Sequence, residues 1–222
     1  MMTREERLTI DVPGKGQVSA ASIRPPEAFA SLAVLHGAGA GMDHQFMSGF
    51  ARAIAGEGVA TLRCNFPYME ADKRSPDRPP VAVATVTAAF EAATARAPDG
   101  EPVWVGGKSF GGRMASVAVA EGLPAAGLVF LGYPLHPPGK PDRVRDEHLT
   151  DIDVPMLFLQ GTKDPFATPE VLEPVLAKLP TATHVAIDGG GHSLERSRRE
   201  DPREVAGALA ALVAAFMRGD GA

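Results

Sequence analysis

Three residues of this chain have the types and the order that nucleophilic catalysis requires. Ser109 lies in the pentapeptide G-K-S-F-G at 107–111, Asp164 follows farther along the chain, and His192 comes directly after three glycines. A serine hydroxyl is a weak nucleophile at neutral pH, so it needs a histidine as base and an acid that orients the histidine. These residues therefore predict acyl transfer, with Ser109 as nucleophile, His192 as base and Asp164 as the orienting acid.

Each of these residues follows a short apolar run that predicts a strand. The runs are 103–105 before Ser109, 156–159 before Asp164 and 184–187 before His192. The carboxyl ends of parallel strands meet at one edge of a sheet, so we expect the three side chains to lie together there. The glycines at 107 and 111 suit a sharp strand-to-helix turn that exposes the serine, where larger side chains would clash.

Backbone donors for the oxyanion are predicted at two turns. The N–H of Phe110, directly after the nucleophile, is one candidate. The other belongs to the small-residue turn after the predicted strand 32–35, where Ala38 is the first choice and Gly39 the second. His36, in the same turn, is interpreted as a residue that orients the turn rather than as a base.

Seven residues on predicted loops or strand ends near this edge are candidates for the substrate pocket. They are His36, His44, Asn65, Phe66, Tyr68, Lys108 and His136. Lys108 could attract an anionic substrate, but an ion pair behind the turn is the favoured interpretation. No spacing of His, Cys, Asp or Glu predicts a metal site, and no cofactor is expected.

Alternatives to this assignment remain in the sequence. Ser109 could be only the N-cap of the helix that follows it. The acid could be Asp188, Asp151 or Asp153, although the loop after the strand 156–159 favours Asp164.

Two glycine-rich turns resemble nucleotide-binding motifs but fail on spacing. A P-loop would need a glycine where Pro102 stands, and the dinucleotide fingerprint would need a third glycine where Met42 stands. We therefore expect no phosphate cradle at either turn.

Apolar runs alternate with helical segments along almost the whole chain. This alternation predicts a three-layer α/β/α sandwich with a mostly parallel sheet. The segments 8–12 and 17–23 alternate polar and apolar residues and predict an antiparallel hairpin at the front of the chain. The proline-rich connection 132–154 is too short for a helical cap domain, so no large lid and an open, shallow site are expected. Residues 1–222 are interpreted as one domain.

Composition excludes several classes of protein. The 222 residues carry a net charge of −5, with acidic and basic residues interleaved, so a nucleic-acid surface is not expected. No apolar stretch is long enough to span a membrane, and no signal peptide is recognisable. The single cysteine, Cys64, suits a reducing compartment. We expect a cytoplasmic protein, and the oligomeric state is not predicted.

The motifs together resemble the α/β-hydrolase superfamily. The resemblance rests on the His-Gly turn at 36–37, the elbow at 107–111, the Asp-Pro pair at 164–165 and the Gly-His-Ser at 191–193. The longer stretches 107–116, 132–140 and 160–164 are similar to a small branch near the dienelactone hydrolases. That branch includes hydrolase-like domains of a testis-expressed protein and of an NSL chromatin-complex subunit. The resemblance implies the fold and the triad, whereas the serine departs from the cysteine nucleophile of dienelactone hydrolases.

These observations favour a serine hydrolase that acts on a small ester, thioester or lactone through an acyl-enzyme on Ser109. The alternative is a hydrolase-fold binding module without turnover, because a fold does not fix a function. The partner expected for the enzyme is a small-molecule acyl substrate.

Overall fold

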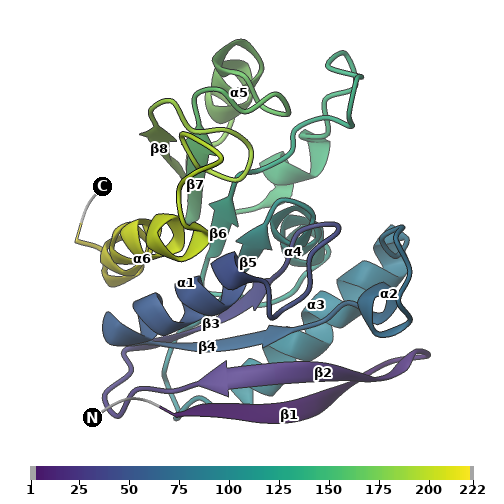
Figure 1. Cartoon of the computed structure of the whole chain (residues 1–222), viewed down its shortest axis with the longest axis vertical. Coiled ribbons are helices and arrows are strands. Elements are labelled where there is room, and N and C mark those ends of the chain that lie inside the picture. Colours follow the sequence, from purple (N-terminus) through teal and green to yellow (C-terminus); the bar gives the residue numbers. More distant parts are fainter. Residues whose placement is uncertain (1–3, 221–222) are drawn as a thin grey trace.

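The structure is a computed structural model that describes residues 4–220, and its centre is one eight-stranded sheet (Figure 1). The strands follow the order β1-β2-β4-β3-β5-β6-β7-β8 across the sheet. Their bounds are β1 Glu5–Val12, β2 Gly16–Ile23, β3 Ala30–Leu35, β4 Val59–Cys64, β5 Val103–Lys108, β6 Leu128–Leu131, β7 Met156–Gly161 and β8 Ala182–Ile187.

The first two strands form the antiparallel hairpin that the sequence predicts. β1 pairs with β2, and β2 joins the rest of the sheet by antiparallel pairing with β4. All other neighbouring strands are parallel. The predicted fold class is therefore confirmed, and the carboxyl ends of β3 to β8 lie at one edge of the sheet.

Helices cover both faces of this sheet (Figure 1). α1 and α6 pack against one face, while α3, α4 and α5 pack against the other. The helix bounds are α1 Gln45–Gly56, α2 Pro67–Glu70, α3 Pro79–Thr94, α4 Phe110–Ala120, α5 Pro169–Leu176 and α6 Pro202–Arg218, with a 3-10 helix at Glu147–Asp151. The 3-10 helix falls in the proline-rich connection 132–154, and the short helix α2 lies between β4 and α3.

The apolar run of β3 shows how the sequence builds two cores. All six residues of the strand are buried. Successive side chains of a strand point to opposite faces, so Leu32 and Val34 pack beneath α1 and α6, whereas Ala33 and Leu35 belong to the opposite core. Burial of one such leucine stabilises the fold by roughly 1.5–3 kcal/mol. Such strands hold the turns that follow them in fixed positions.

The connection from β6 to β7 is irregular apart from a few turns and the 3-10 helix Glu147–Asp151. The described part of the chain thus has no cap domain over the carboxyl edge of the sheet, as the sequence predicts. No helix in residues 4–220 combines the length and the hydrophobicity that a membrane crossing needs.

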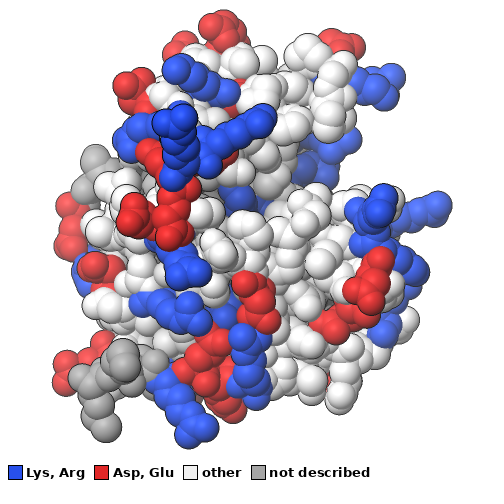
Figure 2. Space-filling view, viewed as in Figure 1, with Lys and Arg blue, Asp and Glu red and all other residues white. Residues whose placement is uncertain are grey.

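Charged side chains of both signs lie intermixed on the face shown in Figure 2.

One charge cluster joins the hairpin to the interior. Arg63, whose side chain is fully buried at the end of β4, donates to the Glu5 carboxylate at 2.8 Å and to the Met42 carbonyl oxygen at 3.0 Å. The same strand ends in Cys64, which is also fully buried.

Candidate active site

Ser109 occupies a one-residue turn between β5 and α4. Its φ of 50° and ψ of −114° are unfavourable for a residue with a side chain. The chain must turn sharply here because α4 packs directly behind β3. A Cβ atom at Gly107 or Gly111 would collide with the carbonyl oxygen of Leu35. The glycines of the pentapeptide therefore allow the close approach that leaves Ser109 partly exposed at the end of the sheet.

The structure brings Ser109, His192 and Asp164 into one hydrogen-bonded chain. Ser109 Oγ lies 2.7 Å from His192 Nε2, and His192 Nδ1 lies 2.8 Å from Asp164 Oδ2. The loops that carry Asp164 and His192 follow β7 and β8, as their apolar runs predict. With a proton on Nδ1, the imidazole donates to the carboxylate, and Nε2 is free to accept the hydroxyl proton.

The Asp164 carboxylate is fully buried and has three hydrogen-bond partners among the described residues: His192, Phe166 and Gln160. Oδ1 accepts from the Phe166 N–H at 2.8 Å, and Oδ2 also accepts from the Gln160 side-chain amide. A buried carboxylate needs such donors to remain charged. In residues 4–220, neither Asp188 nor Asp151 nor Asp153 hydrogen-bonds to His192.

The His192 loop lies against the end of β7 so closely that only glycine fits there. A Cβ atom at Gly161 would collide with the carbonyl oxygens of Gly190 and Gly191. Lys163 N–H also donates to the Gly190 carbonyl oxygen at 2.9 Å. Gly161 thus allows a close backbone contact that sets the position of the loop carrying His192.

A cavity of about 660 Å³ opens in front of Ser109 and His192. Proline and phenylalanine side chains make most of its apolar wall, and its charged residues are both arginines. The other lining residues are Ala38, Pro79, Phe110, Arg113, Pro134, His136, Pro137, Pro138, Arg145 and Phe166. Its size and mixed lining suit a small organic molecule with a polar group.

Two candidate oxyanion donors border this cavity. Phe110 is the first residue of α4, so its N–H has no acceptor within the helix. The N–H of Ala38 donates to no acceptor among the described residues. Gly39, the second choice from the sequence, does not line the cavity and has a φ of 75°. Ala38 and Phe110 are therefore the pair that could stabilise an oxyanion at Ser109.

A sequence profile of the alpha/beta hydrolase domain matches residues 29–218. The chain belongs to the α/β hydrolase family. The match includes Ser109, Asp164 and His192, and it covers every strand except those of the N-terminal hairpin.

Solved structures of hydrolases have the same fold. A lidless α/β serine hydrolase from Xanthomonas campestris is 23% identical, with a TM-score of 0.75 and coverage of 98% of this chain and 96% of that one. A dienelactone hydrolase from Anabaena variabilis is 20% identical, with a TM-score of 0.75 and coverage of 98% and 99%. An α/β serine hydrolase homologue from Coxiella burnetii has the same identity, TM-score and coverage as the Anabaena protein.

Several pocket candidates of this hydrolase do not line the cavity. His36 and Phe66 are fully buried, with their rings edge to face at 4.9 Å between centroids. His36 Nδ1 donates to the Gly37 carbonyl oxygen at 2.9 Å, and Nε2 accepts from the Phe66 N–H at 3.1 Å. Burial lowers the pKa of His36 to about 4. The neutral ring thus joins the turns after β3 and β4, as its predicted orienting role requires, and lies outside the cavity.

Asn65 and Tyr68 also lie outside the cavity. The Asn65 side chain accepts from the Met42 N–H at 2.8 Å and donates to Glu70 Oε1 at 2.9 Å. Tyr68 is buried with only 1% of its surface exposed. Asn65 is held between the loop before α1 and helix α2, and Tyr68 is buried beside His36, so the prediction that these two residues line the pocket is wrong. Of the seven candidates, only His136 lines this cavity.

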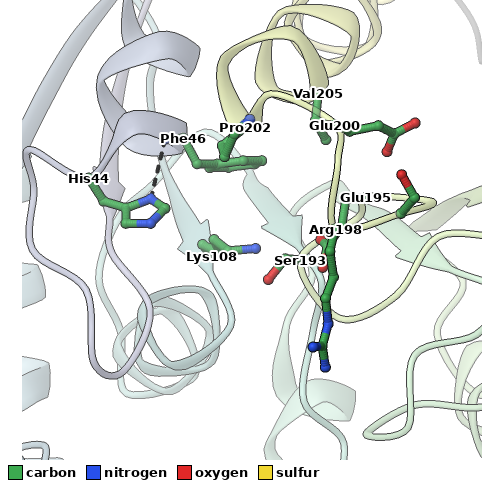
Figure 3. Close-up of a pocket in the computed structure, with 10 residues that line it drawn as sticks. His44, Phe46, Lys108, Ser193, Glu195, Arg198, Glu200, Pro202 and Val205 are labelled. Carbon is green, nitrogen blue, oxygen red and sulfur yellow. Dashed lines mark hydrogen bonds between the residues drawn. The ribbon is translucent and has the colours of Figure 1, made fainter.

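Lys108 and His44 border a second cavity of about 280 Å³ on the other side of the elbow (Figure 3). His44 caps α1, because its Nδ1 accepts from the Phe46 N–H at 3.2 Å. Lys108 Nζ lies 4.6 Å from the centre of the Phe46 ring and has no hydrogen-bond partner in the described chain. The favoured ion pair of Lys108 is therefore not formed, and the burial of the ammonium lowers its pKa to about 8.

Sequence reasoning missed most of the cavity wall. Arg113 stands four residues after Ser109 on α4, so the helical period alone could have placed both on one face. Pro79 opens α3, whereas Arg145, Phe166 and the other three lining prolines come from irregular loops, whose paths no local pattern indicates. Among residues 4–220, no three His, Cys, Asp or Glu side chains lie where they could hold a metal ion.

Proposed function

We propose that this α/β hydrolase is a serine hydrolase that cleaves a small ester, thioester or lactone. The observation that carries the proposal is the hydrogen-bonded chain from Ser109 Oγ through His192 to the buried Asp164 carboxylate, which begins at the wall of an open cavity. A serine that served only as a helix N-cap would need neither partner, and the Ser109 side chain makes no cap hydrogen bond.

The reaction would proceed in two acyl transfers. Ser109 Oγ attacks the substrate carbonyl carbon while its proton passes to His192 Nε2, and the carbonyl oxygen becomes an oxyanion near the N–H groups of Ala38 and Phe110. When the carbonyl re-forms, the bond to the leaving group breaks and His192 gives that group the proton. Water then attacks the acyl-enzyme by the same route, which releases the acid and restores Ser109.

The form of the cavity indicates the size of the substrate. A volume of about 660 Å³ fits a small molecule, and no cap domain covers the cavity in residues 4–220. A long acyl chain would leave most of its apolar surface in water, so it would gain little binding energy. The narrower resemblance to the testis-expressed and NSL-type domains stays a prediction.

Labelling with a fluorophosphonate probe tests the proposal. We expect the wild-type protein to react covalently and the Ser109→Ala variant to remain unlabelled, with short-chain ester turnover reduced by at least 10³-fold. Ser193→Ala is the matched control, because Ser193 neighbours His192 but lines the second cavity (Figure 3). It should be labelled at the wild-type rate.

Two results would contradict the proposal. One is a folded wild-type protein that no probe labels, which would favour the binding-module alternative. The other is ester turnover that survives in Ser109→Ala, which would assign the nucleophile to another residue. Circular dichroism of each variant distinguishes lost chemistry from lost folding.

A further inference from the structure

Arg113 stands beside the nucleophile without a counter-ion. It lies one helical turn after Ser109 on α4, and its backbone N–H donates to the Ser109 carbonyl oxygen at 3.0 Å. The side chain is partly buried and lines the cavity that contains Ser109. Its Nε atom is buried and has no hydrogen-bond partner among the described residues.

A second arginine reaches the same cavity from the connection between β6 and β7. The Arg145 N–H donates to the Leu135 carbonyl oxygen at 2.8 Å, which fixes the loop, and the side chain is exposed at the cavity wall. Burial lowers the pKa of Arg113, and the charge of Arg145 acts in the same direction. The two guanidinium groups are therefore close enough to repel each other.

No acidic side chain balances these charges. The lining residues of the cavity include no Asp or Glu, and neither arginine forms an ion pair in the described chain. Asp146, the residue after Arg145, binds Lys178 Nζ at 3.1 Å instead.

Other arginines of this protein that are buried or partly buried do have partners. Arg63 pairs with Glu5 at 2.8 Å, and Arg24 pairs with Glu101 at 2.9 Å. The missing carboxylate in the cavity is therefore a local feature rather than a general property of the molecule.

We propose that the substrate of this hydrolase carries a carboxylate, which Arg113 and Arg145 bind while the scissile carbonyl lies against Ser109. Guanidinium groups match a carboxylate geometrically and form charge-assisted hydrogen bonds with it. The prolines and Phe166 would contact the carbon chain between the two polar ends. This inference rests on the proposed function, because it names the substrate class of the same site.

Two pairs of esters that differ only in charge test the inference. The first pair is para-nitrophenyl hydrogen adipate and its methyl ester, which places the charge on the acyl group. The second is para-acetoxybenzoate and its methyl ester, which places the charge on the leaving group. We expect the wild-type protein to prefer the anion by about 10-fold to 100-fold in kcat/KM in at least one pair, the range that a charge-assisted pair supplies.

Three variants connect this preference to the arginines. Arg113→Gln and Arg145→Gln should each lose most of the preference, measured as the ratio of kcat/KM for the charged ester to kcat/KM for the neutral ester of the same pair. Arg143→Gln is the matched control, since Arg143 is exposed on the same connection but does not line the cavity. Because Arg145 is exposed, its variant is expected to fold even if Arg113→Gln does not.

A binding measurement separates this inference from the proposed function. Calorimetry with adipate and the Ser109→Ala protein needs no turnover, and binding should weaken at least tenfold when Arg145→Gln is added. Equal kcat/KM for charged and neutral esters in both pairs would overturn the inference, although hydrolysis itself would still support the proposed function. If no ester is hydrolysed, the proposed function fails. The adipate measurement alone then tests whether the two arginines bind a carboxylate, and undetectable binding would overturn the inference.

Discussion

Lys108 places a buried ammonium group one residue before the nucleophile, within electrostatic reach of Glu195 and Asp164 but without a hydrogen bond to either. Its Nζ is buried near the Phe46 ring and has no hydrogen-bond partner in residues 4–220. Burial without a partner disfavours the charged form, which is why the pKa falls from 10.5 to about 8. The ring face offsets part of this cost, since a buried cation–π contact stabilises by about 1–2 kcal/mol.

Replacement of Lys108 by methionine should stabilise the protein at neutral pH. The unfolded chain binds the proton more tightly than the folded chain, so stability of the wild type rises with pH between about 8 and 10.5. The variant lacks this penalty and should gain about 1–3 kcal/mol below pH 8, and the gain should shrink as the pH approaches 10.5. Urea denaturation at several pH values measures the difference.

Lys140→Met is the control for this prediction, because Lys140 is exposed on a loop. It should change the free energy of unfolding by less than about 0.5 kcal/mol at every pH. A Lys108→Met protein that is less stable than wild type at pH 7 would mean that the ammonium contributes more through the Phe46 ring than its burial costs.

At the scale of secondary-structure elements, the contact between β7 and the loop that carries His192 sets the position of the imidazole. At Gly161 the strand end and the loop backbone touch, and no side chain fits between them.

The apolar runs predict the strands and most helices because burial dominates those segments, and the triad follows from the strand ends. The wall of the cavity could not be predicted in the same way. Phe66 follows the correct strand end, yet its ring turns inward, 5.1 Å from the centre of the Phe110 ring.

Gly161→Ala should therefore damage the site as well as the fold. The new methyl group must displace the His192 loop or the end of β7, which costs about 1–3 kcal/mol as overpacking. A displacement of about 1 Å at His192 would slow fluorophosphonate labelling by roughly 10²-fold. The labelling rate and the melting temperature, measured together, check both effects.

Gly207→Ala serves as the matched substitution, since Gly207 lies in α6 with open space around it. That variant should be more stable by about 0.5–1 kcal/mol, because glycine weakens a helix interior, and it should be labelled normally. If Gly161→Ala were labelled as fast as wild type, the contact would not be what positions the imidazole.

At the scale of the whole molecule, one sheet connects all parts of the described chain, from the hairpin at Glu5–Ile23 to the edge strand β8. The matched profile of the family covers most of this sheet. The sequence predicts the alternation of strands and helices because each apolar face must be covered, but it does not fix which two helices share a face. The single domain over 1–222 and the cytoplasmic location stay predictions.

Cys64 lies at the end of β4 inside this sheet, and burial raises the pKa of its thiol to about 12. Only the thiolate reacts with a disulfide reagent, so the folded protein should react at least 10³-fold more slowly than the urea-unfolded chain. The reaction is followed by the absorbance of the released reagent, and a Cys64→Ser protein is the blank. Fast reaction of a protein with an unchanged melting temperature would show that the end of β4 opens separately from the rest. If the reaction of the folded protein is slow, the rate of Cys64 modification reports how often the sheet opens in plain buffer, without denaturant and without substrate.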